Sequence, residues 1–221
     1  MERHSFETDL QTLKNRLLNM AALVEERVHT AIRSLVERRP ELADKVISGD
    51  RDINELQIEI DDRCLKLLAL QNPLATDLRL ITAAMKINAD LERIGDQAVN
   101  IAEYSQKLIR LPLLKPLIDI PRMADMAEAM VRGSIDAFAR KDAALAQRIL
   151  ERDDEVDDLK DQLFRELLTY MMADPATIER ALALILVSRS IERIADHATN
   201  IAEDVVFVVE AKDVRHHHDE S

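Results

Sequence analysis

A stretch of fourteen residues occurs twice in this chain, and the second copy follows the first by 100 residues. Residues 90–103 read DLERIGDQAVNIAE and residues 190–203 read SIERIADHATNIAE, with 9 of the 14 positions identical. Two copies in one chain can be compared as two homologues are, so the positions kept in both are the most informative. The preceding sequence repeats too, because residues 42–56 align with residues 145–159 at an offset of 103. The chain is therefore a duplication of one unit, and a solenoid of many repeats is excluded.

The composition indicates that this unit is helical. The chain has only three glycines, six prolines and no tryptophan, and its aromatic content is 3%. Apolar residues recur at helical spacing, and prolines interrupt the pattern near residues 40, 73, 112–121 and 175. This periodicity predicts six helices, at residues 5–38, 41–70, 74–108, 122–140, 143–172 and 176–209. Short connections favour antiparallel packing, so we expect an all-α fold of two tandem three-helix bundles, residues 1–112 and 113–221, related by a pseudo-twofold axis.

The charge balance bears on the partners that the chain can have. Its net charge is −12 and its pI is near 5.0, so nucleic acid is disfavoured as a direct partner, and cations or basic protein surfaces are expected instead. The single Cys64 lies within a helical apolar pattern and is expected to be packed. The longest apolar run, residues 181–187, is too short to span a bilayer, and the first ten residues contain no apolar signal core. We therefore expect a soluble, cytoplasmic protein that does not span the membrane.

The repeated stretch has a polar face that both copies keep. Drawn as a helix at roughly 100° per residue, Glu92, Asp96, Asn100 and Glu103 share an arc of about 80°, away from the apolar face. The second copy keeps the same face with Glu192, Asp196, Asn200 and Glu203. Such a stripe is also the ordinary solvated outside of a helix. Conservation of the stripe in both copies favours a ligand-binding face, because neighbouring carboxylates repel unless a cation lies between them.

Antiparallel packing brings a second helix to this face. The turn at residues 71–74 sets the register and places residues 50–54 beside residues 92–96. The earlier helix carries Asp50 and Asn54 there, and the corresponding positions of the second half are Asp153 and Asp157. Carboxylate and amide oxygens suit hard cations such as Mg²⁺, Ca²⁺, Mn²⁺ or oxidised iron. A zinc-finger type of site is disfavoured, because no thiolate or repeated histidine takes part.

These motifs resemble those of the PhoU family. The resemblance extends over nearly the whole chain and rests on ERIGD and ERIAD, the NIAE after each, Thr76–Leu80 and the LLTYMM of residues 167–172. It implies two similar three-helix bundles with multinuclear metal clusters held by Glu/Asp-x-x-x-Asp motifs. The implied ligands are Glu92, Asp96, Glu192, Asp196, Asp153, Asp157 and Asp50, with Asn54 in place of an acid and with Asn100, Glu103, Asn200 and Glu203 extending the faces. The implied metal is Fe, Mn, Mg, Ca or Zn.

The resemblance also implies a role. Members of the family are cytoplasmic regulators, often homodimers, that link the ATPase PstB of the phosphate ABC transporter to the sensor histidine kinase PhoR. They restrain phosphate uptake and the phosphate-starvation response when phosphate is plentiful. No catalysis by the protein itself is implied.

Two alternative functions remain beside the regulatory one. A ferritin-like di-iron enzyme needs two Glu-x-x-His motifs, but only Glu26–His29 has that spacing, and its repeat partner, residues 129–132, lacks both ligands. A structural helical module with a solvated acidic face is the other alternative. Among the histidines, His29 and His197 are interpreted as surface or packing residues, and His216–His218 as part of a polar tail.

Overall fold

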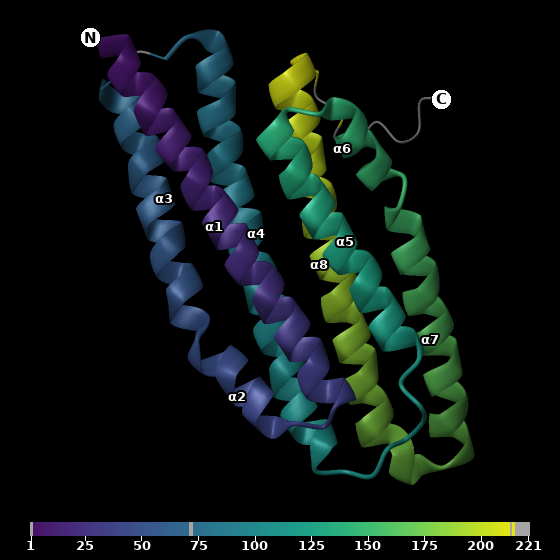
Figure 1. Ribbon diagram of the computed structural model, residues 1–221. Coiled ribbons are helices and arrows are strands. Elements are labelled where there is room, and N and C mark those ends of the chain that lie inside the picture. The colour runs from purple at the N-terminus through teal and green to yellow at the C-terminus, as the bar shows by residue number, and fades with distance from the viewer. Residues whose placement is uncertain (1, 71–72, 213, 215–221) are drawn as a thin grey trace.

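The protein is described by a computed structural model that covers residues 2–70, 73–212 and 214, and almost all of these residues are helical (Figure 1). The helices of the first half are α1 (Glu2–Val36), α2 (Pro40–Ser48), α3 (Asp50–Leu70) and α4 (Ala75–Ile109). Those of the second half are α5 (Asp119–Arg140), α6 (Ala143–Leu150), α7 (Asp153–Ala173) and α8 (Ile178–Glu210), with a 3₁₀ turn, Pro175–Thr177, before α8. The described ranges contain no strand. The predicted all-α fold of tandem three-helix units is confirmed.

Two predicted helices are wrong as continuous elements, since residues 41–70 and 143–172 are each broken near one end. In the first half the break is at Gly49, where a Cβ would lie only 2.4 Å from Nη2 of Arg27. Nη1 of Arg27 donates to the carbonyl of Val46 at 3.3 Å, and Nη2 donates to Asp52 at 3.1 Å. The buried guanidinium of Arg27 therefore occupies the space beside Gly49 and binds both helices at the break.

The second half breaks at the same place by different means. Glu151 and Arg152 form a turn between α6 and α7, and Met130 stands where the first half has Arg27. Acidic residues follow at once, because Asp153, Asp154 and Glu155 fill the first turn of α7. Carboxylates near the amino end of a helix interact favourably with its dipole, so this sequence starts a new helix there. Both breaks place an aspartate of the predicted acidic faces, Asp50 or Asp153, at the first residue of a helix.

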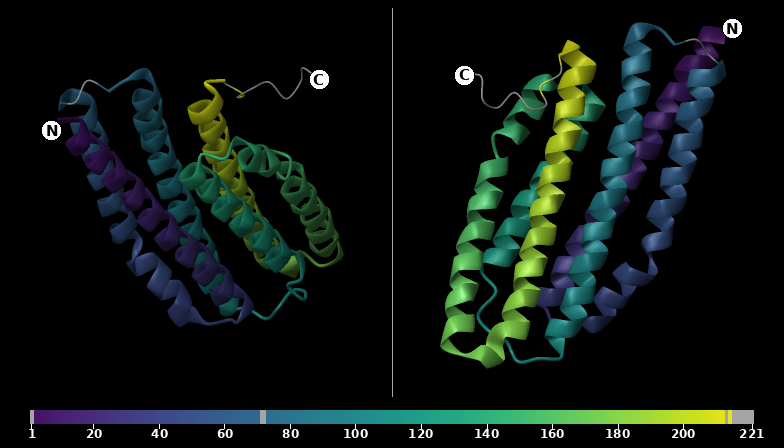
Figure 2. Two further views of the ribbon diagram at one scale, coloured as in Figure 1. Left: turned by 45° about the horizontal axis from the view of Figure 1, so that its top comes forward. Right: turned by 180° about the vertical axis from the view of Figure 1, so that it is seen from behind.

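The two bundles pack side by side and share one hydrophobic core. The helices α4 and α8 run in opposite directions and lie in contact along the back of the molecule (Figure 2), and α1 meets α5 on the front. The buried apolar residues of both halves form one connected cluster. The adjoining ends of α3 and α4 lie at the top of Figure 1, whereas the turn between α7 and α8 lies at the bottom. The halves are thus arranged about an approximate twofold axis.

Several smaller predictions can be compared with this fold. Cys64 is fully buried, and its burial raises the pKa of the thiol to about 12, which leaves it unreactive as expected for a packed cysteine. The helix predicted at residues 122–140 begins three residues earlier, because Pro121 fits within the first turn of α5. None of the described helices has both the length and the apolar composition of a membrane span. Residues 71–72 of the predicted turn and His216–His218 lie outside the described residues.

Candidate functional site

The first-half acidic cluster comprises Asp50, Glu92 and Asp96, and it forms where the start of α3 meets the middle of α4. Burial raises the pKa of Glu92, the charges of Asp96 and Asp50 raise it further, and Arg93 lowers it. Burial also raises the pKa of Asp96, and Asp50 adds to this shift. The three carboxylates therefore act on one another across the two helices, as the register predicted from the sequence requires. Asn54 belongs to the same edge, because its Nδ2 donates to Oδ2 of Asp50 at 2.9 Å.

Close contact between α3 and α4 depends on a glycine. A Cβ at Gly95 would lie 2.9 Å from Cδ1 of Ile53, which is tighter than side chains tolerate. Gly95 directly precedes Asp96, and Ile53 lies one turn beyond Asp50. The missing Cβ lets the two acidic helix edges approach one another at this level.

The second-half acidic cluster comprises Asp153, Asp157, Glu192 and Asp196, from α7 and α8. Burial raises the pKa of Asp196 to about 6, and the charges of Glu192, Asp153 and Asp157 contribute to this shift. Burial also raises the pKa of Asp153, although Thr199 donates to its Oδ1 at 3.2 Å and partly opposes the shift. All four carboxylates thus share one site, as the duplication predicts.

A lysine that the sequence reading missed lies inside the second-half acidic cluster. Nζ of Lys160 donates to Oδ1 of Asp157 at 2.8 Å and to Oε1 of Glu192 at 3.0 Å. Burial alone would lower the pKa of Lys160, but these two hydrogen bonds and charges raise it overall. The first half has Gln57 at the corresponding position. A Lys three residues after an Asp on a helix is a recognisable ion-pair spacing, so the sequence held a signal for this residue.

The remaining predicted ligands do not join the two clusters. Nδ2 of Asn100 donates to Oε1 of Gln97 at 3.3 Å, and Glu103 lies exposed further along α4. Asn200 and Glu203 instead line a cavity of about 310 Å³ between α4 and α8. The structure therefore reduces the twelve predicted residues to two compact sets, namely Asp50, Asn54, Glu92 and Asp96, and Asp153, Asp157, Glu192 and Asp196.

A polar contact between the halves lies beside this cavity. Nδ1 of His197 is 2.9 Å from Oδ1 of Asp90, which is only 6% exposed, and Nδ2 of Asn200 donates to the same oxygen at 3.3 Å. Nearby, Nζ of Lys86 donates to Asp204 at 2.9 Å. The other copy of the motif has Ser190 in place of Asp90 and Gln97 in place of His197, so the comparison of the two copies did not indicate either residue as functional. His197 is a half-buried packing residue, as predicted, but its partner was not foreseen.

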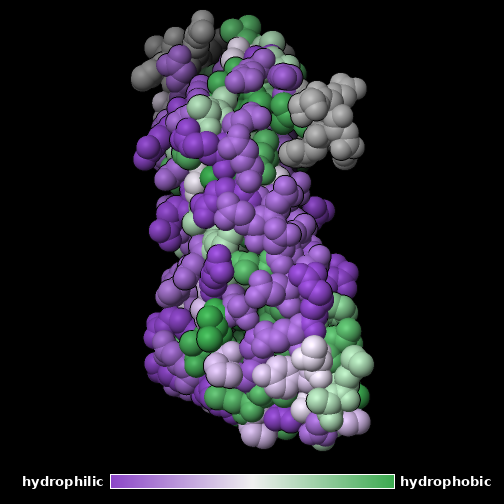
Figure 3. Space-filling model, turned by 90° about the vertical axis from the view of Figure 1, so that its right-hand side faces the viewer, coloured by the Kyte–Doolittle hydropathy of each residue, from purple (hydrophilic) through white to green (hydrophobic). Residues whose placement is uncertain are grey.

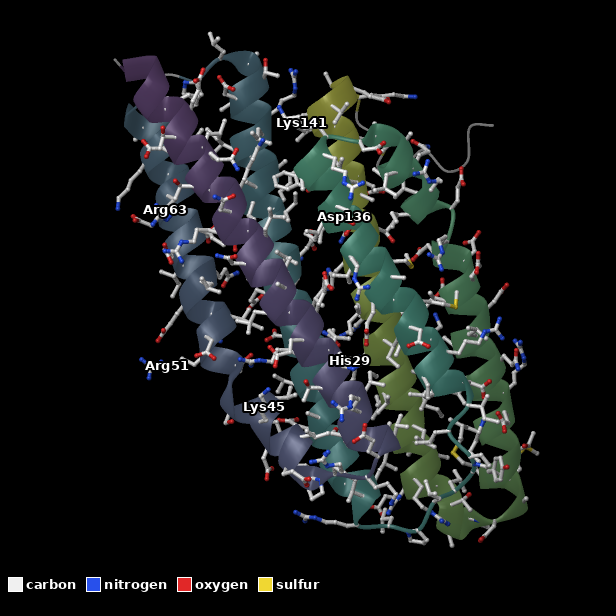
Figure 4. The ribbon with its side chains drawn as sticks, in the orientation of Figure 1. His29, Lys45, Arg51, Arg63, Asp136 and Lys141 are labelled. Atoms are coloured by element: carbon white, nitrogen blue, oxygen red, sulfur yellow. The ribbon has the colours of Figure 1, made fainter. Side chains whose placement is uncertain are left out.

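The di-iron alternative finds no support in the positions of its predicted ligands. Glu26 accepts a hydrogen bond from Lys45 at 2.8 Å on the surface. His29 lies on α1 where this helix passes α5 (Figure 4), and its Nδ1 is 3.4 Å from Oε2 of Glu128. Burial raises the pKa of Glu128, whereas His29 lowers it. These residues border an open groove between the halves and do not converge in a bundle core as di-iron ligands do.

The acidic clusters have the donor chemistry for a metal ion but not the side-chain geometry. Across the described residues, no three or more His, Cys, Asp and Glu side chains converge closely enough to hold a metal in the conformations seen. The donor chemistry does fit a hard cation, since each cluster gathers carboxylates, and burial and nearby negative charges raise the pKa values of Glu92, Asp96, Asp153 and Asp196. In the second-half acidic cluster, the ammonium of Lys160 occupies the place of such a cation between Asp157 and Glu192. Metal binding therefore requires rotation of these side chains.

Comparison with known proteins gives a consistent result over the whole chain. The family model described as the PhoU domain matches twice, at residues 17–105 and 120–205. The phosphate-specific transport system accessory protein PhoU homolog of Aquifex aeolicus is 43% identical over 210 residues, which cover 95% of each chain. The crystal structure of PhoU from Pseudomonas aeruginosa has a TM-score of 0.91 and 39% identity, and it covers 94% of this chain and 100% of that one. The phosphate transport system regulatory protein PhoU from Streptococcus pneumoniae superposes with a TM-score of 0.88 at 29% identity, over 95% and 99% of the two chains.

Proposed function

Because this chain belongs to the PhoU family, we propose that it is a regulatory accessory protein of a phosphate transport system. In this role it restrains phosphate uptake and the phosphate-starvation response while phosphate is plentiful. The observation that carries the proposal is the match over both halves to relatives that are named as phosphate-specific transport accessory proteins.

The protein acts in this proposal as a cytoplasmic adaptor between the transporter ATPase PstB and the sensor kinase PhoR. Its net charge of −12 suits contacts with basic protein surfaces. The polar residues that both halves keep lie on helix faces, where they can meet another protein or an ion. The proposal requires no catalysis by the chain itself, and the assembly that we expect is a homodimer.

The two acidic clusters form the proposed metal sites. Asp50, Glu92 and Asp96 would hold a cation in the first half, with the oxygen of Asn54 as a further donor. Asp153, Asp157, Glu192 and Asp196 would hold one in the second half. A bound hard cation, whether Mg²⁺, Mn²⁺, Ca²⁺, iron or Zn²⁺, would supply positive charge that relieves the repulsion among the carboxylates. The raised pKa values of Glu92, Asp96, Asp153 and Asp196 support this proposal, since each shift reports destabilised negative charge.

Deletion of the gene tests the regulatory role. Phosphatase output should rise in phosphate-rich medium when the gene is absent, and a plasmid copy should repress it again. Continued repression in the deletion strain would contradict the proposal. A pull-down of the tagged chain from phosphate-replete cells should recover the transporter ATPase or the kinase.

A quadruple variant tests the metal sites. Changing Glu92, Asp96, Glu192 and Asp196 to alanine should abolish bound metal in elemental analysis of the purified protein and leave its helical circular dichroism unchanged. The matched control is Glu103→Ala, which removes an exposed acid of the same helix face and should leave the metal content as it was. Unchanged metal in the quadruple variant would rule out these residues as ligands.

A further inference from the structure

Apolar side chains remain exposed on two adjoining helices of the second half. Phe164, Leu168 and Met172 follow one another at intervals of four residues, so they form one stripe along α7. Ile178 and Leu182 form the corresponding stripe at the start of α8, directly after the short 3₁₀ turn. Met172 is 78% exposed, and the other four are between 41% and 47% exposed. We name these five residues the α7–α8 apolar face.

This face continues into the second-half acidic cluster. On α7, Asp161 and Asp157 lie three and seven residues before Phe164, on the same side of the helix. On α8, Glu192 and Asp196 lie ten and fourteen residues after Leu182, again on that side. From Met172 to Asp157 the surface extends about 22 Å along α7 at 1.5 Å per residue. Figure 3 views this side of the molecule and shows hydrophobic side chains at its lower end, mostly hydrophilic ones across its middle and further hydrophobic ones near its top.

Packing of the fold does not require the continuous stripe of Phe164, Leu168 and Met172. In the first half, which has the same architecture, Asp61, Ala69 and Thr82 occupy the positions of Phe164, Met172 and Leu182. Leu65 and Leu78 keep the apolar character of Leu168 and Ile178. The first half also exposes Ile58 and Leu74, but only the second half has a continuous apolar stripe at intervals of four residues along this helix. Contiguous exposed apolar patches that are bordered by polar residues mark interaction sites.

The charge of the half that carries the α7–α8 apolar face indicates what can cover it. Residues 113–221 contain 14 Lys and Arg against 23 Asp and Glu, whereas residues 1–112 contain 16 against 19. Two copies that met through this face would bring their acidic clusters together, and like charges at an interface disfavour association. Anionic lipid surfaces attract basic segments and would repel this half for the same reason. The complementary occupant is therefore a protein segment with apolar and basic residues.

We propose that the α7–α8 apolar face docks an amphipathic helix of a partner protein. A third helix can lie along the exposed edges of two others, with anchors at intervals of three and four residues that bury their side chains against them. The partner helix covers Phe164, Leu168 and Met172 with its apolar turns, and its Lys or Arg side chains lie one to two turns further on, against Asp157 and Asp161. Arg165 directly follows Phe164 and Arg189 lies seven residues after Leu182, and both are exposed, so the partner is not uniformly basic.

This proposal rests on the proposed function only in that both require a protein partner. It adds the side of the molecule, the chemical class of the segment and its direction along α7. It also gives the second-half acidic cluster a role in partner binding that is separate from metal binding.

A synthetic peptide provides the test. The probe is a fluorescein-labelled 20-residue amidated helix with leucines at helical spacing in its first half and lysines on the same face of its second half. Binding to the full chain is followed by fluorescence anisotropy in chelator-treated buffer. We expect Leu168→Asp to weaken binding at least tenfold, whereas Leu65→Asp, the equivalent change in the first half, leaves binding unchanged. A peptide with glutamates in place of the lysines should bind at least tenfold more weakly, and a scrambled peptide should not bind.

Labelled methionine methyl groups locate the peptide independently. The NMR signal of Met172 should shift on addition of the peptide, whereas the signal of Met85 in the first half should stay in place. Equal shifts at both methionines, or equal losses from Leu168→Asp and Leu65→Asp, would overturn the proposal. A chain that is dimeric in size-exclusion chromatography and becomes monomeric with Leu168→Asp would overturn it too, because a second copy would then cover the face. Gene deletion tests the proposed function separately, so the two can fail independently.

Discussion

The two acidic clusters are built on the same frame but balance their charge differently. The first-half acidic cluster has three carboxylates, with Asn54 and Gln57 beside them. The second-half acidic cluster has four carboxylates, because Asp157 replaces the amide, and it has Lys160 where the first has Gln57. When every group is ionised, the added carboxylate and the added ammonium cancel.

The two clusters therefore share their excess of negative charge and not the identity of each side chain. In the second half, Lys160 bridges α7 to α8 and holds Glu192 and Asp157 in place. In the first half, Arg51 points away from α4 (Figure 4) and pairs with Glu55 of its own helix at 2.6 Å. The first-half acidic cluster is therefore more open to a cation from solution. Exchanging residues between the halves is the direct way to test this comparison.

Removal of Lys160 should give the largest effect on stability. Lys160→Gln leaves four carboxylates uncompensated and breaks two charge-assisted hydrogen bonds, so we expect the free energy of unfolding at pH 7 to fall by about 2 kcal/mol. Adding Asp157→Asn, which reproduces the first-half acidic cluster, should restore most of the loss. Urea denaturation in chelator measures both. The control Lys45→Gln breaks an exposed ion pair with Glu26 and should lower the free energy of unfolding by less than about 1 kcal/mol. Equal losses from the two variants would contradict the prediction that Lys160 is the more important of the two lysines.

Metal affinity should follow the same exchange. Mn²⁺ must displace Lys160 in the second half, so Lys160→Gln should strengthen binding there by about tenfold, equivalent to about 1.4 kcal/mol. Gln57→Lys should weaken binding in the first half by a similar factor. Isothermal titration of the metal-free protein measures the two sites. If both variants bind Mn²⁺ as the wild type does, the lysine does not compete with a cation.

The pH dependence of stability should reveal the strain in the second-half acidic cluster. The pKa of Asp196 is raised to about 6 in the folded chain, so the native state binds a proton more tightly than the unfolded state does. Stability of the metal-free protein should therefore decrease as the pH rises from about 4 to about 6, by about 1 kcal/mol after discounting for solvent exposure of this carboxylate. Asp196→Asn should reduce this slope and leave the contributions of Asp153, Glu92 and Asp96, whose pKa values are also raised, whereas Asp158→Asn, an exposed acid of α7, should leave it unchanged. Urea midpoints measured across this pH range decide the matter.

The smallest effect concerns the backbone beneath the clusters. The second half has Ala195 and Val156 where the first has Gly95 and Ile53. Gly95→Ala alone should change the stability by less than about 1 kcal/mol, because the gain in helix propensity is opposed by the contact with Ile53. Combined with Ile53→Val, it should stabilise the chain by up to about 1 kcal/mol, as seen by the thermal midpoint. A double variant less stable than Gly95→Ala would show that the halves pack differently here.

The sequence predicted the helices well and their interruptions poorly. Periodicity and prolines placed six helical segments within a few residues, because amphipathic patterns and X-Pro steps act locally. The breaks at Gly49 and Glu151–Arg152 were missed, since the first depends on Arg27, a side chain that arrives from another helix. Long-range contacts of this kind leave little trace in a local pattern.

The candidate sites show the same limit. The duplication identified the carboxylates that the structure gathers, because both copies keep them. It could not separate Asn200 and Glu203 from the acidic clusters, since all lie on one helix face and only the neighbouring helix distinguishes them. The other half has Gln57 in place of Lys160 and Ser190 in place of Asp90, so the repeat alone could not identify either residue. Asp90 meets His197 through the packing of the halves, which no repeat predicts.

The antiparallel packing of α4 against α8 has a consequence for the origin of the chain. A polypeptide that ended near residue 112 would leave its α4 side uncovered, and a second identical molecule would be the natural cover, related by the same twofold axis. In a symmetric dimer every substitution appears in both subunits, whereas after gene fusion the two halves can change independently. Asp90 opposite His197, with Ser190 and Gln97 at the equivalent positions, is an unequal pair that two identical molecules could not form.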